Sequence, residues 1–204
     1  MAHEIETKVL LFDVDGVIIR GPKEKWSTGY AKEVGIPAEK MDEFFKGDFK
    51  LCSIGKADLK EKITPFLTKW KWRGNADEFL AYWFENDSNI DEKLLEEIKK
   101  IRAGGIRCYV ATQQEKYRKN YLWEKLGLKN YFDGIFCTCD IGYEKFTPKF
   151  FNFIFRKLKV KPEEIMFFDD KRKGAELASK LGVRAYVYEN IEGLKKQTEL
   201  LLRN

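Results

Sequence analysis

The stretch Val9-Leu10-Leu11-Phe12-Asp13-Val14-Asp15-Gly16 decides the fold of this 204-residue chain. Its first four residues are all apolar, which is typical of a strand buried on both faces, as in parallel sheets covered by helices. Two acids and a glycine follow directly. Because ligands of open α/β sheets bind beyond the carboxyl ends of the strands, these acids are candidates for a site. Taken alone, they are equally well explained as a solvent-facing pair.

The chain after residue 91 alternates between strand and helix patterns. Apolar runs predict strands over 106–111, 134–138, 165–168 and 184–188. Amphipathic segments predict helices over 91–104, 115–126, 148–158, 172–181 and 191–202. Alternation at this spacing predicts an α/β fold, in which a Rossmann-like parallel sheet carries helices on both faces.

The segment between the first strand and residue 91 is helical and rich in aromatic residues. Short amphipathic patterns predict helices over 29–35, 38–45, 57–70 and 76–84, and no strand pattern interrupts them. The sequence therefore predicts a helical insert after the first strand. We expect its aromatic side chains to form the core of that insert rather than a surface for bases or sugars. These residues are Trp26, Phe44, Phe45, Trp70, Trp72, Phe79, Trp83 and Phe84.

Composition excludes several classes of protein. Hydrophobic residues make up 44% of the chain and charged residues 35%, which excludes a disordered chain. The net charge of +5 is spread out, the densest stretch being Lys69–Arg73, so a small anionic substrate fits and nucleic acid is not expected. No apolar run approaches the roughly 18 residues of a membrane span, and the N-terminus lacks a signal-peptide pattern. We therefore expect a cytoplasmic protein without a membrane partner.

The histidine and cysteine residues limit which kinds of catalysis and metal site are possible. The one histidine, His3, stands near the chain end, which excludes Ser-His-Asp and Cys-His catalysis. Four cysteines, Cys52, Cys108, Cys137 and Cys139, form no disulfide framework. We expect buried free thiols, with Cys137 and Cys139 on one face of a strand, rather than a zinc site. Carboxylates, lysine or a metal must therefore carry any catalysis.

Polar residues gather where the predicted strands end. The first strand leads to Asp13 and Asp15, and others lead to Thr112, Lys145, Asp169 and Asp170. Carboxylates this close repel one another unless a cation lies among them, and Mg²⁺ is the usual choice beside phosphate. Such a group suits phosphoryl transfer. Asp13 would attack phosphorus, Asp15 would act as acid and base, and Thr112 and Lys145 would hold the phosphoryl oxygens.

Four motifs in this order resemble those of the haloacid dehalogenase-like (HAD) hydrolase superfamily: Asp13-Val14-Asp15-Gly16-Val17, Thr112, Lys145-Phe-Thr-Pro148 and Phe167-Phe168-Asp169-Asp170. The resemblance implies an HAD-like core over residues 1–20 and 88–204, and a mobile C1-type cap over 21–87. It implies that Asp13 is the nucleophile and a Mg²⁺ ligand, and that Asp15 is the acid/base and lends its carbonyl to the metal. Thr112, Gln113 and Lys145 would bind substrate. Asp169 would complete the metal site, with Asp170 nearby or bound through water.

Three positions depart from the family pattern. Phe146 follows the lysine where proline is usual, which leaves Lys145 less firmly placed and makes Lys149 a rival. Gln113 stands where asparagine is common. Lys171, Arg172 and Lys173 follow the last acids, and Gly174 then stands where asparagine is frequent.

The function implied is Mg²⁺-dependent hydrolysis of a small phosphomonoester, so the partner would be a small phosphorylated metabolite. The second aspartate of the first motif argues against dehalogenation. Two alternatives stay open: a phosphomutase acting on a sugar phosphate, and a non-catalytic HAD-like binding protein, for example one that binds RNA through Lys69–Arg73. Simpler structural explanations exist as well: Thr112 could cap a turn, and Asp169 and Asp170 could cap the next helix. The sequence does not decide the oligomeric state.

Overall fold

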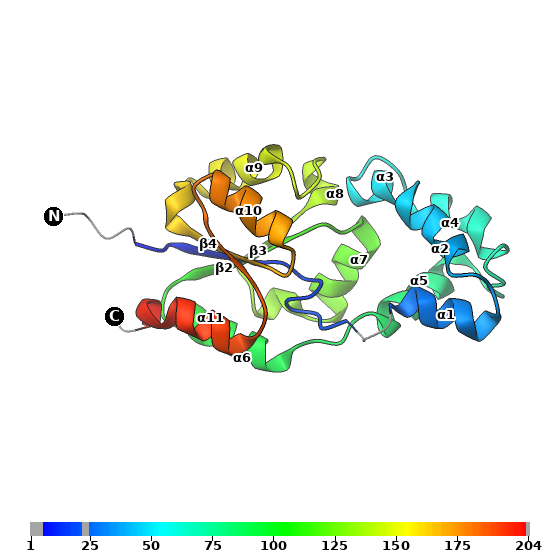
Figure 1. The fold of residues 1–204 in the computed structure, drawn as a ribbon, viewed down its shortest axis with the longest axis horizontal. Helices are drawn as coiled ribbons and strands as arrows, with labels where there is room; N and C mark the ends of the chain where they lie inside the picture. Colours follow the sequence, from blue (N-terminus) through cyan, green and yellow to red (C-terminus); the bar gives the residue numbers. More distant parts are fainter. Residues whose placement is uncertain (1–5, 22–24, 203–204) are drawn as a thin grey trace.

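The computed structural model describes residues 6–21 and 25–202, so His3 lies outside the described residues. Within these ranges, five strands form one parallel sheet in the order β3-β2-β1-β4-β5 (Figure 1). The strands are β1 Val9–Phe12, β2 Arg107–Thr112, β3 Gly134–Cys137, β4 Ile165–Asp169 and β5 Arg184–Val187. The predicted α/β class with a parallel sheet is confirmed.

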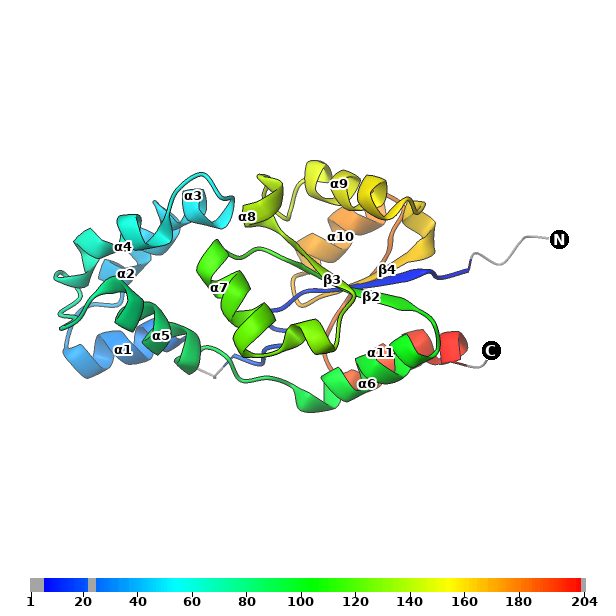
Figure 2. The same ribbon diagram turned by 180° about the vertical axis from the view of Figure 1, so that it is seen from behind.

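Helices cover both faces of this sheet, because successive strand residues point to opposite sides. Leu10 and Phe12 face one hydrophobic cluster with α6 (Glu92–Ala103) and α11 (Ile191–Thr198). Val9 and Leu11 face another with α9 (Pro148–Leu158) and α10 (Arg172–Lys180). Figures 1 and 2 show these two helix layers on either side of the sheet.

Between β1 and α6, the described residues form five helices of a separate lobe, the cap: α1 Trp26–Val34, α2 Glu39–Lys46, α3 Phe49–Ser53, α4 Leu59–Leu67 and α5 Ala76–Asn86. The cap has its own hydrophobic cluster, in which Phe44, Trp70 and Phe79 have no exposed surface. The expectation that the aromatic residues form the core of the insert is confirmed. An inserted helical cap between β1 and β2 is therefore established, while its boundaries at residues 21 and 87 stay a prediction.

Backbone pairing and side-chain contacts join the cap to the core. The two linkers run side by side, since Arg20 N–H donates to the carbonyl of Asn89 at 2.8 Å and Asp91 N–H to that of Ile18 at 2.9 Å. Farther from the linkers, Asp58 of the cap accepts hydrogen bonds from Lys116 at 2.5 Å and Tyr117 at 2.9 Å. The cap is thus docked on α7 (Lys116–Asn120) in this structure.

Several predicted elements needed correction. The predicted helix over 115–126 is α7 followed by a π-helical turn, Tyr121–Lys125. The prediction missed α3 and the short α8, Thr138–Ile141, with which β3 ends. Cys137 therefore ends a strand and Cys139 lies in a helix, so the one-face prediction was wrong; their sulfurs lie 3.3 Å apart. Short 3₁₀ turns complete the described elements: Leu128–Asn130, Pro162–Glu164 and Glu199–Leu202.

All four cysteines are free; three are buried, as expected, and Cys139 is partly exposed. None of the helices in the described part of the chain has the length and apolar character needed to span a membrane.

Candidate active site

The register of the sheet brings the motif residues together. Phe12 pairs with Val110 on one side and with Phe168 on the other, and Asp13 N–H donates to the carbonyl of Phe168 at 2.9 Å. The carboxyl ends of β1, β2 and β4 therefore meet at one edge of the sheet. Asp13, Thr112 and Asp169 lie at that edge, and all three are buried.

Lys145 lies within this acidic cluster although it comes from a loop. Its ammonium nitrogen is 2.6 Å from Oδ2 of Asp13 and 2.9 Å from Oδ2 of Asp169. Oxygens of Asp13, Asp169 and Asp170 lie within 4.8 Å of one another. The lysine side chain is only 3% exposed, so both ion pairs are shielded from water.

Burial and neighbouring charges set the protonation of these groups. Burial raises the pKa of the Asp13 carboxyl to about 7, against the opposing effect of the Lys145 charge, and the Asp169 carboxylate raises it further. For Lys145, burial alone would lower the pKa, but the Asp13 and Asp169 carboxylates outweigh it and the pKa is raised. Lys145 therefore stays cationic, while Asp13 lacks enough positive charge to be fully ionised at neutral pH.

Unpartnered oxygens face this cluster. The hydroxyl of Thr112 and Oδ1 of Asp170 are buried and make no hydrogen bond, and Oδ2 of Asp169 has only its ion pair with Lys145. A buried polar atom without a partner is costly unless a ligand completes it. Hard oxygen ligands of this kind suit Mg²⁺, so the donor set fits the predicted metal. Thr112 caps no turn, which excludes that structural explanation.

The turn after β1 needs glycine at position 16 for two reasons. Gly16 has φ +84°, a conformation that other residues rarely adopt. A side-chain carbon there would lie 2.5 Å from the carboxyl carbon of Asp170. Only glycine at position 16 therefore lets this turn pack against the Asp170 carboxyl beside Asp13.

Two of the departures from the family pattern are linked in space. A side-chain carbon at Gly174 would lie 2.5 Å from Oδ2 of Asp169 and 2.9 Å from the Phe146 ring. The Lys145 ammonium lies 5.3 Å from the centre of that same ring. Phe146 thus fills the space beside Lys145 that only glycine at position 174 leaves open. The larger residue therefore does not displace Lys145 from the cluster.

The other predicted site residues have different surroundings. Lys149 lies over the ring of Tyr143, 5.2 Å from its centre, and has no contact with the cluster among the described interactions. The side-chain oxygen of Gln113 accepts a hydrogen bond from the backbone N–H of Lys145 at 3.3 Å. Asp169 accepts the N–H of Lys171 at 2.7 Å, which fixes the turn before α10, whereas Asp170 pairs with the Lys171 ammonium.

Asp15 is held by residues that the sequence reasoning missed. Its Oδ2 accepts a hydrogen bond from Gln114 at 2.6 Å, and its Oδ1 lies 3.8 Å from Nη2 of Arg118. Both side chains are buried, whereas that of Asp15 is 58% exposed. They follow Thr112 by two and six positions, and this closeness in the sequence is the one signal that could have identified them.

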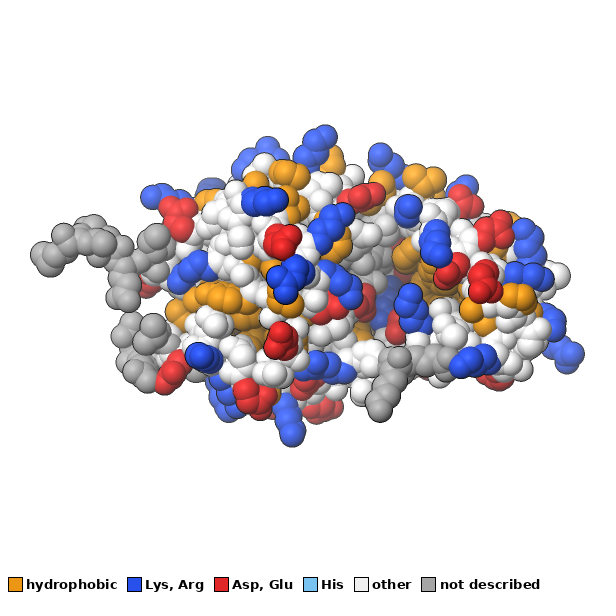
Figure 3. Space-filling model, in the orientation of Figure 1, with side chains coloured by type: hydrophobic (Ala, Val, Ile, Leu, Met, Phe, Trp, Pro, Cys, Tyr) orange, Lys and Arg blue, Asp and Glu red, His pale blue; other side chains and the backbone are white. Residues whose placement is uncertain are grey.

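Two cavities differ in their relation to this cluster. The surface is hollowed where the cap meets the core, and hydrophobic side chains line the cap side of the hollow (Figure 3). A cavity of about 270 Å³ lies at the cap linkers. Its wall includes Gly21, Lys25, Trp26, Ser27, Asp42, Phe45, Trp83 and Asp87. Asp87 connects it to the site, because the Asp87 carboxylate lies 3.5 Å from Arg118.

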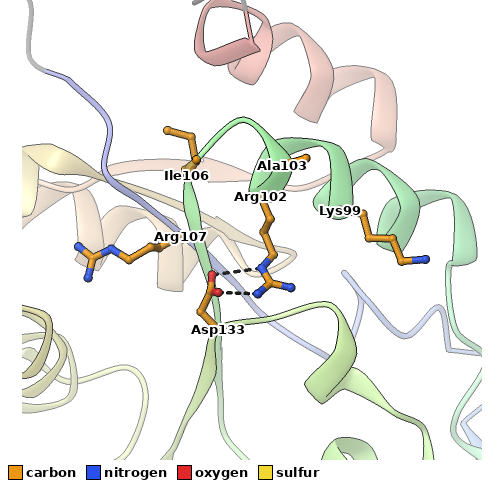
Figure 4. A pocket seen from close by; sticks show the side chains of 7 residues that line it. Lys99, Arg102, Ala103, Ile106, Arg107 and Asp133 are labelled. Atoms are coloured by element: carbon orange, nitrogen blue, oxygen red, sulfur yellow. Dashed lines mark hydrogen bonds and ion pairs between the residues drawn. The ribbon is translucent and has the colours of Figure 1, made fainter.

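The second cavity, of about 390 Å³, lies at the start of β2, at the opposite end of the sheet from Asp13 (Figure 4). Three basic residues line it, namely Lys99, Arg102 and Arg107. Arg102 already donates two hydrogen bonds to Asp133, at 2.5 and 3.2 Å, so its charge is compensated. This cavity has no part in the cluster of acids.

Comparison with known proteins gives several similar chains. The protein is 21% identical to D-ribitol-5-phosphate phosphatase of Bacteroides thetaiotaomicron, over 97% of this chain and 99% of that one. It is 20% identical to a phosphorylated carbohydrates phosphatase of Thermotoga maritima, over 95% and 90% of the two chains. Flavin mononucleotide hydrolase 1 of Arabidopsis thaliana is 31% identical over 77 residues, which are 38% of this chain and 31% of that protein.

The fold is also found in solved structures. A crystal structure of an HAD family enzyme from B. thetaiotaomicron, in complex with magnesium and inorganic phosphate, superposes with a TM-score of 0.78 at 19% identity. It covers 92% of this chain and 98% of that one. Residues 7–182, which include every motif position discussed above, match the haloacid dehalogenase-like hydrolase family. The resemblance seen in the sequence is therefore confirmed, and this protein belongs to the haloacid dehalogenase-like hydrolase family.

Proposed function

We propose that this protein is a Mg²⁺-dependent phosphatase that hydrolyses a small phosphorylated metabolite through an aspartyl-phosphate on Asp13. The observation that carries the proposal is the convergence of three acids, a buried lysine and an unpartnered hydroxyl at one edge of the sheet. This combination suits phosphoryl transfer, since that reaction depends mainly on positioning and on neutralising charge.

Asp13, Asp169 and Asp170, with the backbone carbonyl of Asp15, would hold Mg²⁺. The ion would supply positive charge that offsets the phosphoryl oxygens and favours the ionised form of Asp13. Oδ1 of Asp170, which has no hydrogen bond, and Oδ2 of Asp169, whose one described partner is Lys145, support this assignment. Lys145 adds a second positive charge beside Asp13.

The protein side chains then divide the reaction between them. The Asp13 carboxylate attacks phosphorus, and the bond from phosphorus to the substrate oxygen breaks as Asp15 protonates that oxygen. Thr112 donates its hydroxyl to a phosphoryl oxygen, and Lys145 stabilises the charge that develops there. Asp15, now ionised, takes a proton from water, which attacks the aspartyl-phosphate and releases phosphate.

The cavity of about 270 Å³ between the cap helices and the linkers is the proposed site for the leaving group. Trp26, Phe45 and Trp83 offer ring faces for the carbon chain, and Asp42 and Asp87 offer carboxylates for hydroxyl groups. The indole N–H of Trp83 is buried, makes no hydrogen bond of normal geometry, and interacts with the Asp87 carboxylate of the same cavity. A polyhydroxylated phosphate, such as a sugar or sugar-alcohol phosphate, matches these groups. The substrates named for the two full-length relatives support the same class.

The test is phosphate release from a panel of phosphomonoesters, with and without Mg²⁺, using wild-type protein and Asp13→Asn. Metal-dependent release that the variant lacks would support the proposal. Asp77→Asn is a matched control, because Asp77 is an exposed cap carboxylate paired with Lys60 at 2.5 Å. It should keep wild-type rates. Equal turnover by wild type and Asp13→Asn would refute the aspartyl-phosphate mechanism.

The leaving-group site has its own test in Trp83→Phe, which keeps a ring and removes the N–H. A net hydrogen bond contributes about 0.5–1.5 kcal/mol, so kcat/KM for a polyol phosphate should fall roughly 2- to 10-fold. The same quantity for p-nitrophenyl phosphate, which has no hydroxyl groups to bind, should change little. An equal fall for both substrates would remove Trp83 from substrate binding.

The alternatives give other outcomes of the panel. A phosphomutase would release little phosphate but would convert an added sugar bisphosphate into an isomerised product. A binding protein would turn over nothing with metal present. Trp70 of the Lys69–Arg73 stretch is fully buried and donates its indole N–H to the carbonyl of Lys40 at 3.0 Å. The stretch therefore does not offer Trp70 as a stacking surface for RNA bases.

A further inference from the structure

Arg118 is a charged side chain buried on α7, between two acids from different parts of the chain. Its Nη2 donates a hydrogen bond to the backbone carbonyl of Asp87 at 2.5 Å and lies 3.5 Å from the Asp87 carboxylate. The same nitrogen lies 3.8 Å from Oδ1 of Asp15. A guanidinium buried in this way is costly without acids around it, and Asp15, Asp87 and the buried Glu115 carboxylate supply that negative charge.

We propose that Arg118 is a positioning residue for Asp15, and that it links this side chain to the cap through Asp87. The inference rests on the proposed function, in which Asp15 protonates the leaving oxygen. It assigns a role to a residue outside the four motifs. It also connects the proposed leaving-group site to Asp15, the acid that must protonate that group.

The first step of the argument is the orientation of Asp15. Gln114 holds Oδ2 at 2.6 Å, and Arg118 faces Oδ1. Both residues lie on the segment that follows Thr112, so the chain that leaves β2 after the proposed phosphate-binding hydroxyl also orients the acid. A side chain that is 58% exposed would otherwise exchange among several rotamers.

The second step is the connection to the cap. Asp87 directly follows α5 and lines the leaving-group cavity. Figures 1 and 2 both show α5 beside α7 at the junction of the two lobes. Since Nη2 lies closer to Asp87 than to Asp15, any movement of α5 that shifts Asp87 changes how firmly Arg118 holds Asp15. Nη1 is buried without a hydrogen bond in the described structure, so the guanidinium has a donor available for a closer contact.

The test compares leaving groups in the first turnover of the full-length enzyme with Mg²⁺. An alkyl alcohol needs protonation to leave, whereas p-nitrophenolate leaves without it. General acid catalysis contributes about 10²–10⁴-fold, so Arg118→Met should slow first-turnover release of the alkyl alcohol by roughly 10²-fold. First-turnover release of p-nitrophenolate should fall less than about tenfold. Arg118→Lys, which keeps the charge but not the fork of donors, should lie between wild type and Arg118→Met.

The matched control is Lys125→Met, which removes an exposed cap–core ion pair of 3.6 Å with Glu85 and has no described contact with Asp15 or Arg118. It should slow neither substrate. An equal loss for both leaving groups in folded Arg118→Met would overturn the inference and leave Arg118 a structural residue, as would no loss for either. If Arg118→Met fails to fold, Arg118→Lys decides by the same ratio of the two rates. Wild-type protein that releases neither leaving group would instead refute the proposed function, and the inference with it.

Discussion

The Asp13→Asn substitution should make the metal-free protein more stable at neutral pH while having little effect at pH 4. Burial raises the pKa of the Asp13 carboxyl from 3.8 to about 7, against the attraction of Lys145. The folded state therefore keeps a proton that the unfolded chain releases. Between about pH 4 and pH 7 the unfolded state binds fewer protons, so the free energy of unfolding falls as the pH rises.

The size of the effect follows from the same two values. At 1.36 kcal/mol for each pH unit, the interval from 3.8 to about 7 corresponds to roughly 4 kcal/mol of lost stability above pH 7. Asparagine resembles the protonated acid at every pH, so the variant avoids this loss. Wild type and variant should thus be similar at pH 4 and differ by up to about 4 kcal/mol at pH 8.

The assay is urea unfolding at several pH values in the presence of a chelator. Glu115 also titrates in this range, since burial raises its pKa to about 7, but it does so equally in both proteins. The difference between the two curves therefore isolates Asp13. Parallel curves for wild type and Asp13→Asn would refute the reasoning. Saturating Mg²⁺ should stabilise wild type more at pH 8 than at pH 4, because the cation favours the ionised carboxylate.

Three further predictions concern the same edge of the sheet. Asp169→Asn should raise the Mg²⁺ concentration needed for half-maximal activity more than Asp170→Asn does, because Asp169 is fully buried beside Asp13. The opposite order in a Mg²⁺ titration would make Asp170 the direct metal ligand. Thr112→Val should leave the free energy of unfolding within about 1 kcal/mol of wild type, since the hydroxyl makes no hydrogen bond, but it should lower kcat/KM about 10²-fold. A large loss of stability in urea unfolding would instead favour a structural role for Thr112. Gly174→Ala should destabilise the protein by about 1–3 kcal/mol and weaken Mg²⁺ activation, because the added carbon meets Asp169 and the Phe146 ring. Phe146→Leu in the same background should recover part of the stability. No recovery in thermal melts would contradict the link between positions 146 and 174.

Local sequence patterns determined most of the core. The four apolar residues of β1 and the strand–helix alternation after residue 91 specify a parallel sheet, because burial on both faces requires continuous apolar strands. Once the sheet is parallel, the residues that follow its strands must share an edge. Asp13, Thr112 and Asp169 could therefore be placed together from the sequence alone, and the register of β1, β2 and β4 puts them there.

Short elements and their boundaries were harder to predict. Helix α3 is five residues long, and α8 begins within the predicted third strand. Elements of this length carry too few residues for a periodic pattern. Their position depends on contacts with distant residues, such as the hydrogen bond of 2.5 Å from the Thr138 hydroxyl to the carbonyl of Ser53.

Tertiary structure alone decided the surroundings of the motif residues. Phe146 and Gly174 are 28 positions apart, and their contact makes room for the ring beside Lys145, which its ion pairs with Asp13 and Asp169 hold in place without the usual proline. Arg118 and Asp87 belong to different lobes, and no local pattern in the sequence shows that they meet. The sequence by itself determined which chemical groups meet at the carboxyl edge, because strand direction fixes that. Which side chains orient and neutralise those groups depends on distances between separate elements, which only the packed fold sets.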